Sequence, residues 1–476
     1  FWLQRGAVAR RLRSLVLRPR IAIVIGCVAL ATLWCCAWAA CDRVVWYDTG
    51  LYHLGVMKWN ATYPATPGLA NLHGRFGYDN SVHVYAAYVD AYWEGVAVHA
   101  MNGFFIALVL VQWFVEMFSA RTPRGRLRQI YCLLTIPFIL GKLWTVEVAS
   151  LSSDLPLALM SLVLVLDLLS LPRARSVLPI VYVLALATAT TTTKFGGLGL
   201  AVPTLVLAII AVRRSSWRVR WVVFGLPLVL TIAWLVRNVI VSGWLVFPVF
   251  GHMPVPWAVP KPVGEDHLRW IESWARIPGK TPAEVLDHGF RHWFVTWFEQ
   301  FRRLPELVLF FVSLTLLVWR IVSGPSRSAA TRAAEWTAIA AGALGILQWF
   351  VGAPDVRFGG FLFWLLPAAL VAPMLAGAMS DRVLRAPTRT FALLVSLMLT
   401  AWTGGLTPRL GTPPRWFGRP PDPRLGDNSI AHTANGMDFP VPVKGDQCWD
   451  SPLLCTPYAG AQTLRDRADP GAGFNP

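Results

Sequence analysis

Charged residues are scarce in this sequence. Asp, Glu, Lys and Arg together make up 14% of the 476 residues, whereas an average soluble domain has about 25%. Apolar residues make up 55%, the mean hydropathy is +0.50, and many of them fall in long uninterrupted runs, such as 21–40. Runs of about twenty apolar residues match the thickness of a bilayer core. The composition therefore excludes an ordinary soluble protein and predicts an all-α, polytopic membrane protein.

The sequence also lacks the short motifs that mark many enzymes. It contains no P-loop, no dinucleotide-binding glycine pattern, no serine-nucleophile motif and no zinc-ligand spacing. It shows no internal repeat, which speaks against the inverted-repeat architecture of many secondary transporters. Function must therefore be sought in individual ionisable residues.

Lysine is scarce as well, so the net charge of +17 comes mainly from arginine. The arginines gather in short clusters at every second connection between apolar runs, as the positive-inside rule requires of cytoplasmic loops. This distribution explains the positive charge without a nucleic-acid partner. The clusters lie at 5–20, 121–128, 173–175, 213–220, 320–332 and 382–389.

The alternation of these clusters predicts about eleven membrane-spanning helices, with a cytoplasmic N-terminus and an extracytoplasmic C-terminus. The first apolar run is expected to be an uncleaved anchor, because it is long and lacks a clear small-residue cleavage pattern. We expect a membrane domain over 1–407 with outer loops 42–95 and 242–303, followed by a small irregular outer tail, 408–476. The spans are expected near 21–41, 96–118, 129–146, 154–171, 177–193, 195–212, 221–241, 304–320, 335–352, 358–379 and 390–407.

Aromatic residues are concentrated in the two outer loops. In the first loop, residues 50–59 are expected to form a short interfacial helix, and the stretch 83–93 is rich in Tyr and Trp, residues that favour the headgroup region. The second loop contains two pairs of tryptophans, each pair four residues apart and therefore on one helical face. Anchoring at the membrane surface is favoured over a direct contact with substrate. The pairs are Trp270 with Trp274 and Trp293 with Trp297.

The seven cysteines fall into two groups. Five lie in or beside apolar runs and are expected to pack as small apolar residues. Cys448 and Cys455 instead bracket a short turn in the Pro- and Gly-rich tail. Because an extracytoplasmic tail meets oxidising conditions, we expect a Cys448–Cys455 disulfide there.

Ionisable residues inside or beside membrane spans are costly and are therefore functional candidates. Here they come from five separate connections on the predicted outer side: Asp48 and His53; Lys142, Glu147 and Asp154; Lys194; Arg237; and Asp355 with Arg357. Structural roles compete with functional ones. Asp355 and Arg357 can pair locally, Glu147 or Asp154 can be a helix-start charge favoured by the helix dipole, and Glu116 and Asp167 are expected to be structural. Lys194, beside two glycines, is suited to hold a phosphate.

Transfer of a sugar from a lipid phosphate fits this set of residues. An acceptor hydroxyl needs a general base, which a carboxylate supplies. The departing lipid phosphate needs cations that stabilise its developing charge.

Several segments resemble motifs of a group of bacterial multi-pass membrane proteins, and the similarity covers most of the chain. An acidic residue in the first outer loop, on a helical membrane domain, resembles the GT-C superfamily of polyprenyl-phosphate-sugar-dependent glycosyltransferases. The segments are 47–53 (Tyr-Asp-Thr-Gly-Leu-Tyr-His), 67–76 (Pro-Gly-Leu-Ala-Asn-Leu-His-Gly-Arg-Phe), 445–450 (Gly-Asp-Gln-Cys-Trp-Asp), Arg237-Asn238 with Ser242-Gly243, and Asp355 with Arg357-Phe358.

The resemblance implies an inverting glycosyltransferase in the bacterial cytoplasmic membrane, with Asp48 as the base. The acceptor is expected to be a glycan, lipid or protein at the outer face. Glu147, Asp154 and Asp79, together with Asp90 and Glu94, compete for a second acidic role, and some members of the superfamily bind a divalent metal such as Mg²⁺ or Mn²⁺. Alternatives are a lipid-linked-glycan polymerase or ligase, and a flippase or transporter. The expected contacts to donor phosphate, sugar or acceptor are Lys194, Arg237, Lys142, Arg357, His53, His73 and Arg75.

Overall fold

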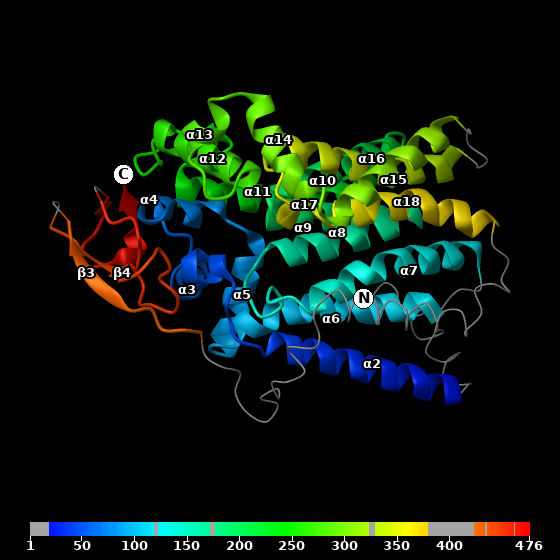
Figure 1. The fold of residues 1–476 in the computed structure, drawn as a ribbon, viewed down its shortest axis with the longest axis horizontal. Coiled ribbons are helices and arrows are strands. Elements are labelled where there is room, and N and C mark those ends of the chain that lie inside the picture. The colour runs from blue at the N-terminus through cyan, green and yellow to red at the C-terminus, as the bar shows by residue number, and fades with distance from the viewer. Residues whose placement is uncertain are drawn as a thin grey trace.

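The computed structural model describes residues 19–118, 122–171, 177–322, 329–378, 423–433, 436–460 and 462–476. The described part is mostly helical and elongated, with long helices running side by side and shorter elements gathered at one end (Figure 1). We call these shorter elements, residues 41–96, 243–304 and 423–476 as far as described, the cap. The rest of the described chain forms the helix bundle.

The bundle is built around α8 (Asp154–Leu169). This helix is buried along almost its whole length, since only Met160 and Asp167 are partly exposed. Its neighbours are α6, α7, α9, α16 and α18, and the first residue of α8, Asp154, therefore lies at the centre of the bundle end that faces the cap. The bundle helices are α2 (Pro19–Ala40), α6 (Ala97–Phe118), α7 (Pro123–Leu143), α8, α9 (Leu178–Thr193), α10 (Leu198–Val212), α11 (Trp217–Ser242), α15 (Pro305–Val322), α16 (Ala329–Gly352) and α18 (Leu362–Ala378).

Six helical segments in the described chain are long and apolar enough to cross a membrane, so the protein is a polytopic membrane protein. They are α6, α10 with the preceding short helix η4 (Phe195–Gly197), α11, α15, α16, and α17 (Val356–Gly359) together with α18. The outer faces of α11 and α15 are rich in exposed Val, Leu and Ile side chains, as expected for surfaces in contact with lipid.

The predicted number of about eleven spans is wrong by these criteria. Helices α8 and α9 have 16 residues each, and about 20 are needed to cross a bilayer core. The apolar sequence of α8 reflects burial among other helices rather than contact with lipid. Helix α7 carries four basic residues, and α2 contributes only the shorter apolar stretch Leu30–Ala40. The predicted span 390–407 lies outside the described residues.

The first part of the cap contains the helix that the sequence predicted at 50–59, and the Tyr- and Trp-rich stretch 83–93 is largely helical as well. A π-helical turn, η2 (Thr49–His53), continues directly into α3 (Leu54–Thr62), and α5 (Ser81–Tyr92) follows after two short helices. These short helices are α4 (Leu69–Leu72) and the 3-10 helix η3 (Gly74–Tyr78).

The second part of the cap contains α12 (Lys261–Arg276), α13 (Pro282–Leu286) and α14 (Phe290–Phe301). The two tryptophan pairs have different environments. Trp293 and Trp297 of α14 are buried against the bundle, and Trp297 Nε1 donates to the Pro354 carbonyl at 2.6 Å. Trp270 and Trp274 of α12 are 43% and 47% exposed. The first pair therefore fixes the cap to the bundle, and only the second pair is available to a membrane surface.

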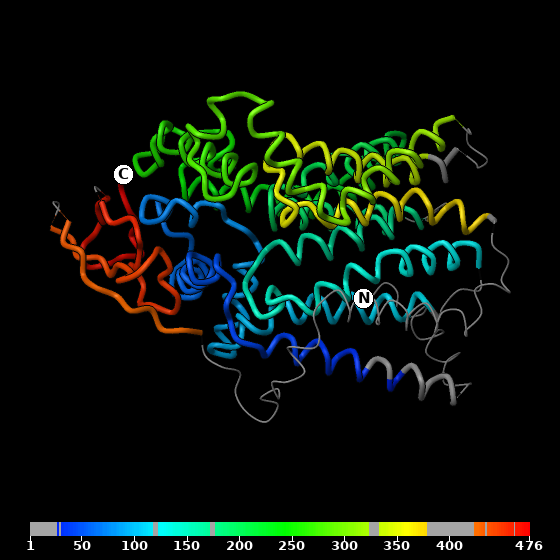
Figure 2. The backbone as a smooth tube through the Cα atoms, viewed as in Figure 1, coloured from blue at the N-terminus to red at the C-terminus, as the bar shows by residue number. Residues whose placement is uncertain are grey.

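The C-terminal segment, which comprises the described residues from 423 to 476, completes the cap (Figure 2). It contains two antiparallel strand pairs, β3 (Asn428–His432) with β4 (Asp438–Pro442) and β5 (Thr463–Leu464) with β6 (Phe474–Asn475). A third pair, β1 (Trp244–Val246) with β2 (Phe250–His252), follows α11. These short pairs are the departures from an all-α fold in the described chain.

A close helix contact yields a first prediction. A Cβ atom at Gly199 of α10 would lie 2.8 Å from the backbone of Gly345 in α16, so the two helices can approach this closely only because residue 199 is glycine. Gly199→Leu should therefore force these helices apart and cost about 1–3 kcal/mol of stability. Gly225→Leu is the matched control, since a Cβ atom at Gly225 of α11 meets no atom within 4 Å. Thermal unfolding in detergent should show a lower Tm for Gly199→Leu alone, and equal Tm values would contradict the contact.

Candidate functional site

Asp48 lies at the N-terminus of η2, where the chain leaves α2 and enters the cap. The residue is 9% exposed. Gly50, two residues later, packs so closely under the Trp449 ring that a Cβ atom there would lie 2.6 Å from it. The carboxylate is thus held on a short rigid turn beneath the C-terminal segment.

Arg357 connects Asp48 with Asp154. Its Nη1 lies 2.9 Å from Asp48 Oδ2, and its Nε lies 3.8 Å from Asp154 Oδ2. The sequence allowed a local ion pair between Arg357 and Asp355, but these two side chains do not form one. Asp355 instead caps α17 by accepting the backbone N–H of Arg357 at 2.8 Å, and this cap leaves the guanidinium free to reach the two other carboxylates.

Lys194 reaches the same place from the short connection between α9 and α10. Its Nζ donates to Asp154 Oδ1 and also lies 3.9 Å from the centroid of the Phe358 ring. The guanidinium of Arg357 lies 4.7 Å from the same ring. Phe358 therefore brings the two cations together, since each is attracted to the electron-rich face of the ring.

Arg75 approaches from η3. Its Nη1 lies 3.5 Å from Asp48 Oδ1, and its guanidinium lies 5.7 Å from the centroid of the Tyr52 ring. Burial raises the pKa of Tyr52 well above its usual value, with the nearby carboxylate of Asp48 acting in the same direction. Tyr52 is therefore a neutral hydroxyl at physiological pH rather than a further charge.

We call Asp48, Asp154, Arg75, Lys194 and Arg357 the charged centre. It has three cations and two carboxylates, so its formal charge is +1 when all are ionised. Two buried N–H donors beside it, Trp46 Nε1 and Arg357 Nε, have no hydrogen-bond partner among the described residues. The Arg357 guanidinium lies 5.8 Å from the centroid of the Trp46 ring, so both donors belong to the same region.

Four further candidate residues form two ion pairs that are separate from this centre. Glu147 is 1% exposed and accepts from Lys142 Nζ at 2.7 Å, so these two charges neutralise each other. Asp79 accepts from Arg237 Nε at 2.6 Å, and Asn60 Oδ1 accepts from Arg237 Nη2 at 2.6 Å. Arg237 is thus engaged by two side chains of the cap and makes no ion pair with the charged centre.

The two candidate histidines, His53 and His73, lie near the charged centre. His53 is buried, and its Nδ1 lies 3.2 Å from Thr49 Oγ1. His73 is stacked on Phe76, and the ring of Tyr458 from the C-terminal segment lies edge-on at 5.0 Å. Burial lowers the pKa of both histidines well below the usual value, and neighbouring positive groups add to this effect. Both are neutral rings in this structure, which limits them to packing and hydrogen bonding.

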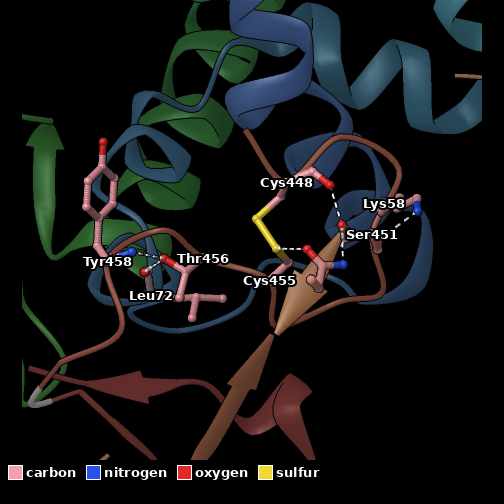
Figure 3. The surroundings of a disulfide bond; sticks show 8 residues. Lys58, Leu72, Cys448, Ser451, Cys455, Thr456 and Tyr458 are labelled. Carbon is pink, nitrogen blue, oxygen red and sulfur yellow. Dashed lines mark hydrogen bonds between the residues drawn. A yellow bond between two sulfur atoms is a disulfide. The ribbon is translucent and has the colours of Figure 1, made fainter. Parts of the chain in front are cut away.

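The C-terminal segment packs on the part of the cap that carries Asp48. Tyr47 Oη donates to the Asp446 carboxylate at 2.6 Å, Lys58 Nζ pairs with Asp450 at 2.6 Å, and Thr456 Oγ1 donates to the Leu72 carbonyl at 2.8 Å. The disulfide that the sequence predicted is present, with an S–S distance of 2.07 Å between Cys448 and Cys455 (Figure 3). The tail is thus an integral part of the cap.

The roles of Trp46 and Phe358 were not predicted from the sequence. Trp46 provides an N–H donor, and Phe358 provides a ring that contacts two cations. The signal was present, because Phe358 directly follows Arg357 and Trp46 lies two residues before Asp48. The contacts of Asp446, Gln447 and Trp449 with the first loop were not predicted either, although the resemblance includes their segment.

The donor set of the charged centre does not fit a divalent metal. Mg²⁺ and Mn²⁺ prefer carboxylate and carbonyl oxygens, yet both carboxylates of the centre are engaged by arginine or lysine. The described residues contain no group of three or more His, Cys, Asp or Glu side chains placed to share a metal ion. We derive no catalytic step through a metal.

A second buried charge cluster lies at the opposite end of the bundle. Arg128 pairs with Glu116 at 2.9 Å and with Asp167 at 2.6 Å, linking α6, α7 and α8. Glu116 and Asp167 therefore have the structural role that the sequence predicted. Asp167 is 13 residues from Asp154, or roughly 20 Å along the α8 axis, and no charged residue of α8 lies between them.

In comparison with protein-family models, the chain matches one family over most of its length. It is described as a domain of unknown function (DUF8201), and the match covers residues 1–364. No curated protein and no solved structure matches significantly. The matched range includes every residue of the charged centre, whereas the C-terminal segment lies beyond it.

Buried histidines of the cap predict sensitivity to acid. Burial lowers the pKa of His267 on α12 to about 4, and the positive charge of Arg75 contributes. In the unfolded chain, His267 therefore binds a proton below about pH 6.5, whereas in the folded chain it does so only below about pH 4. Stability is complete above pH 6.5 and falls by at most about 1.4 kcal/mol per pH unit for this residue in that window.

Thermal unfolding between pH 7.5 and pH 4.5 checks this prediction. His267→Phe should flatten the pH dependence of Tm, because phenylalanine keeps the packing against Phe247 but has no proton to bind. His292→Phe is the control, since His292 is exposed on α14. An unchanged pH dependence in His267→Phe would show that this histidine does not contribute.

Proposed function

The chain belongs to the DUF8201 family, and we propose that it is a GT-C-type glycosyltransferase of the bacterial cytoplasmic membrane. In this proposal it moves a sugar from a polyprenyl-phosphate donor to an acceptor glycan, lipid or protein at the outer face. The donor reaches the site from the membrane, and the acceptor reaches it from the side of the cap. The reaction is inverting, with Asp48 as the base.

The excess of cations in the charged centre is the observation that carries the proposal. Three cations face two carboxylates, and the buried donors Trp46 Nε1 and Arg357 Nε lack an acceptor among the described residues. A buried N–H without a partner costs about 1–3 kcal/mol, and an anion with several oxygens would satisfy these donors. Phosphate has that property, and it forms strong charge-assisted bonds with guanidinium groups.

The position of the centre favours surface chemistry over transport. A transporter needs polar groups along a path through the bilayer. In the described bundle, the buried charges of α8 lie at its two ends, with no charged residue between Asp154 and Asp167. The centre lies where the bundle meets the cap, close to helices whose outer faces are apolar. This is where a lipid-linked phosphate and a polar acceptor can meet.

The proposed reaction uses the charged centre in one displacement. The donor phosphate binds Lys194, Arg357 and Arg75, and so draws the two guanidinium groups away from Asp48. Asp48 Oδ1, the oxygen that lies 3.5 Å from Arg75, accepts the proton of the acceptor hydroxyl. The hydroxyl oxygen forms a bond to the anomeric carbon while the bond from that carbon to the phosphate oxygen breaks. The electron pair of that bond leaves with the polyprenyl phosphate, whose charge the same cations stabilise.

This assignment revises the expected phosphate contacts. Arg237 and Lys142 are each neutralised by a buried carboxylate, so we assign them structural roles. Asp154 is the second acidic residue, and its role is to hold Lys194 and Arg357 in place. A polymerase or ligase that relies on cationic histidines is less well supported, because burial lowers the pKa of both His53 and His73.

The proposed orientation rests on two independent features. The arginine clusters alternate along the sequence in the manner of cytoplasmic loops, which assigns the cap to the opposite side. The Cys448–Cys455 disulfide belongs to the cap, and disulfides persist in oxidising compartments outside the cytoplasm.

Substitutions in the charged centre test the mechanism. Asp48→Asn keeps the size of the side chain but removes the proton acceptor, so transfer from a polyprenyl-phosphate sugar in liposomes should fall by about 10²–10⁴-fold. Its affinity for polyprenyl phosphate should be retained. Lys194→Ala and Arg357→Ala should each weaken that affinity by about tenfold or more, because each removes a charge-assisted hydrogen bond.

Arg269→Ala is the matched control for the loss of a cation. Arg269 also lies in the cap, but it pairs with Asp287, and both side chains are about half exposed. This variant should retain both transfer and affinity. Near-native turnover by Asp48→Asn would refute Asp48 as the base and direct attention to Asp154.

A further inference from the structure

The backbone around Asp48 is bracketed by the C-terminal segment. Gln447 Nε2 donates to the carbonyl of Tyr47, the residue before Asp48, at 2.8 Å. The backbone N–H of Trp449 donates to the carbonyl of Gly50, two residues after Asp48, also at 2.8 Å. Two hydrogen bonds from one short stretch thus hold both sides of the proposed base.

Cys448 lies between these two donors. Its disulfide partner, Cys455, closes a short loop, and both sulfur-bearing residues are buried. Figure 3 shows the loop with Ser451 inside it, where the Ser451 hydroxyl donates to the Cys448 carbonyl. Lys58 Nζ donates to the Ser451 carbonyl at 2.9 Å, which ties the loop to α3. The disulfide therefore fixes the stretch that brackets Asp48.

We call the two hydrogen bonds from Gln447 and Trp449 the bracket. It requires a backbone conformation that an unconstrained chain rarely adopts. Trp449 has φ +49° and Leu454 has φ +76°, values in the left-handed region that disfavours residues with a Cβ atom. Each such residue costs of order 1 kcal/mol or more and persists only where the surroundings enforce it. The disulfide and the packing of the Trp449 ring on Gly50 provide that enforcement.

We propose that the loop 446–455, closed by the Cys448–Cys455 disulfide, positions Asp48 through Gln447 and Trp449, and that opening this disulfide lowers glycosyl transfer. A dithiol reductant opens it in a two-electron step. The dithiol gives two electrons and two protons, the S–S bond breaks into the thiols of Cys448 and Cys455, and the dithiol becomes a disulfide. The bracket then loses its constraint and the turn that carries Asp48 loosens. Gln447 and Trp449 are positioning residues, since neither touches the reacting atoms.

This inference rests on the proposed role of Asp48 for its effect on activity, but its structural part does not. Hydrogen exchange at the Trp449 amide reports the bracket directly, whether or not the protein transfers a sugar. The failure of the bracket and the failure of the proposed function are therefore distinguishable.

The experiment uses the full-length protein in liposomes, before and after treatment with a dithiol, with the state of both cysteines verified by mass spectrometry. We expect exchange at Trp449 and at residues 47–54 to become at least about tenfold faster on reduction, because local opening then costs less. Peptides from α16 should not change. Equal exchange at Trp449 with the disulfide open would overturn the proposal.

The activity measurement uses the same samples. Reduction should lower kcat by about 10- to 100-fold, since a small displacement of a catalytic group has effects of that size, while the affinity for polyprenyl phosphate should change by less than about threefold. The double variant Cys448→Ser/Cys455→Ser should show the low kcat and no response to dithiol. A dithiol effect of the same size in the double variant would contradict a role for this disulfide.

Gln447→Ala tests the bracket with the disulfide intact, so that a general folding defect is avoided. It should lower kcat but leave affinity unchanged, and Gln447→Glu should not rescue it, because a carboxylate cannot donate to the Tyr47 carbonyl. Lys444→Ala, on an exposed residue of the same stretch, is the control and should behave as wild type. Equal kcat in Gln447→Ala and Lys444→Ala would overturn the positioning role of Gln447.

Discussion

The guanidinium of Arg357 between Asp48 and Asp154 is the interaction on which the rest of the site depends. It joins a carboxylate of the cap to a carboxylate of the most buried bundle helix, at 2.9 Å and 3.8 Å. Its position depends in turn on the Asp355 cap of α17 and on Gly359, where a Cβ atom would lie 2.3 Å from Trp349. Removing one partner of such a buried pair is costly because it leaves an unpaired charge. Cap and bundle are therefore joined through the residues of the proposed chemistry.

The central position of α8 explains why the cations gather at one end of the bundle. Five helices surround it, so its first residue, Asp154, is held where the connections of the neighbouring helices meet. Lys194 comes from the connection between α9 and α10, and Arg357 comes from the connection between α16 and α18. A single buried carboxylate, Asp154, thus pairs with cations from distant parts of the sequence. The C-terminal segment packs on the turn that carries Asp48, through the contact of Trp449 with Gly50.

The sequence identified the members of the charged centre but not their pairing. Arg75 was a candidate only through the resemblance, whereas Asp48, Asp154, Lys194 and Arg357 were candidates because charge beside apolar runs is costly. Arg237 and Lys142 had the same signal, and only the structure shows that Asp79 and Glu147 neutralise them. Long-range pairing is not encoded in local periodicity. The number of spans was overestimated for a related reason, since an apolar helix buried in protein, such as α8, reads like one that faces lipid. The docking of the Pro- and Gly-rich tail could not be predicted in detail, because it depends on long-range packing such as that of Phe439 and Phe474 in one apolar cluster with Trp59 of the first loop.

The central claim is that the charged centre binds the phosphate of a polyprenyl-linked donor. A cryo-electron microscopy structure of the protein in lipid with bound polyprenyl phosphate tests it most directly. The account predicts phosphate oxygens within hydrogen-bonding distance of Lys194 and Arg357, with Asp48 released from Arg357 and facing the phosphate. A phosphate bound elsewhere, with Arg357 still spanning Asp48 and Asp154, would contradict it.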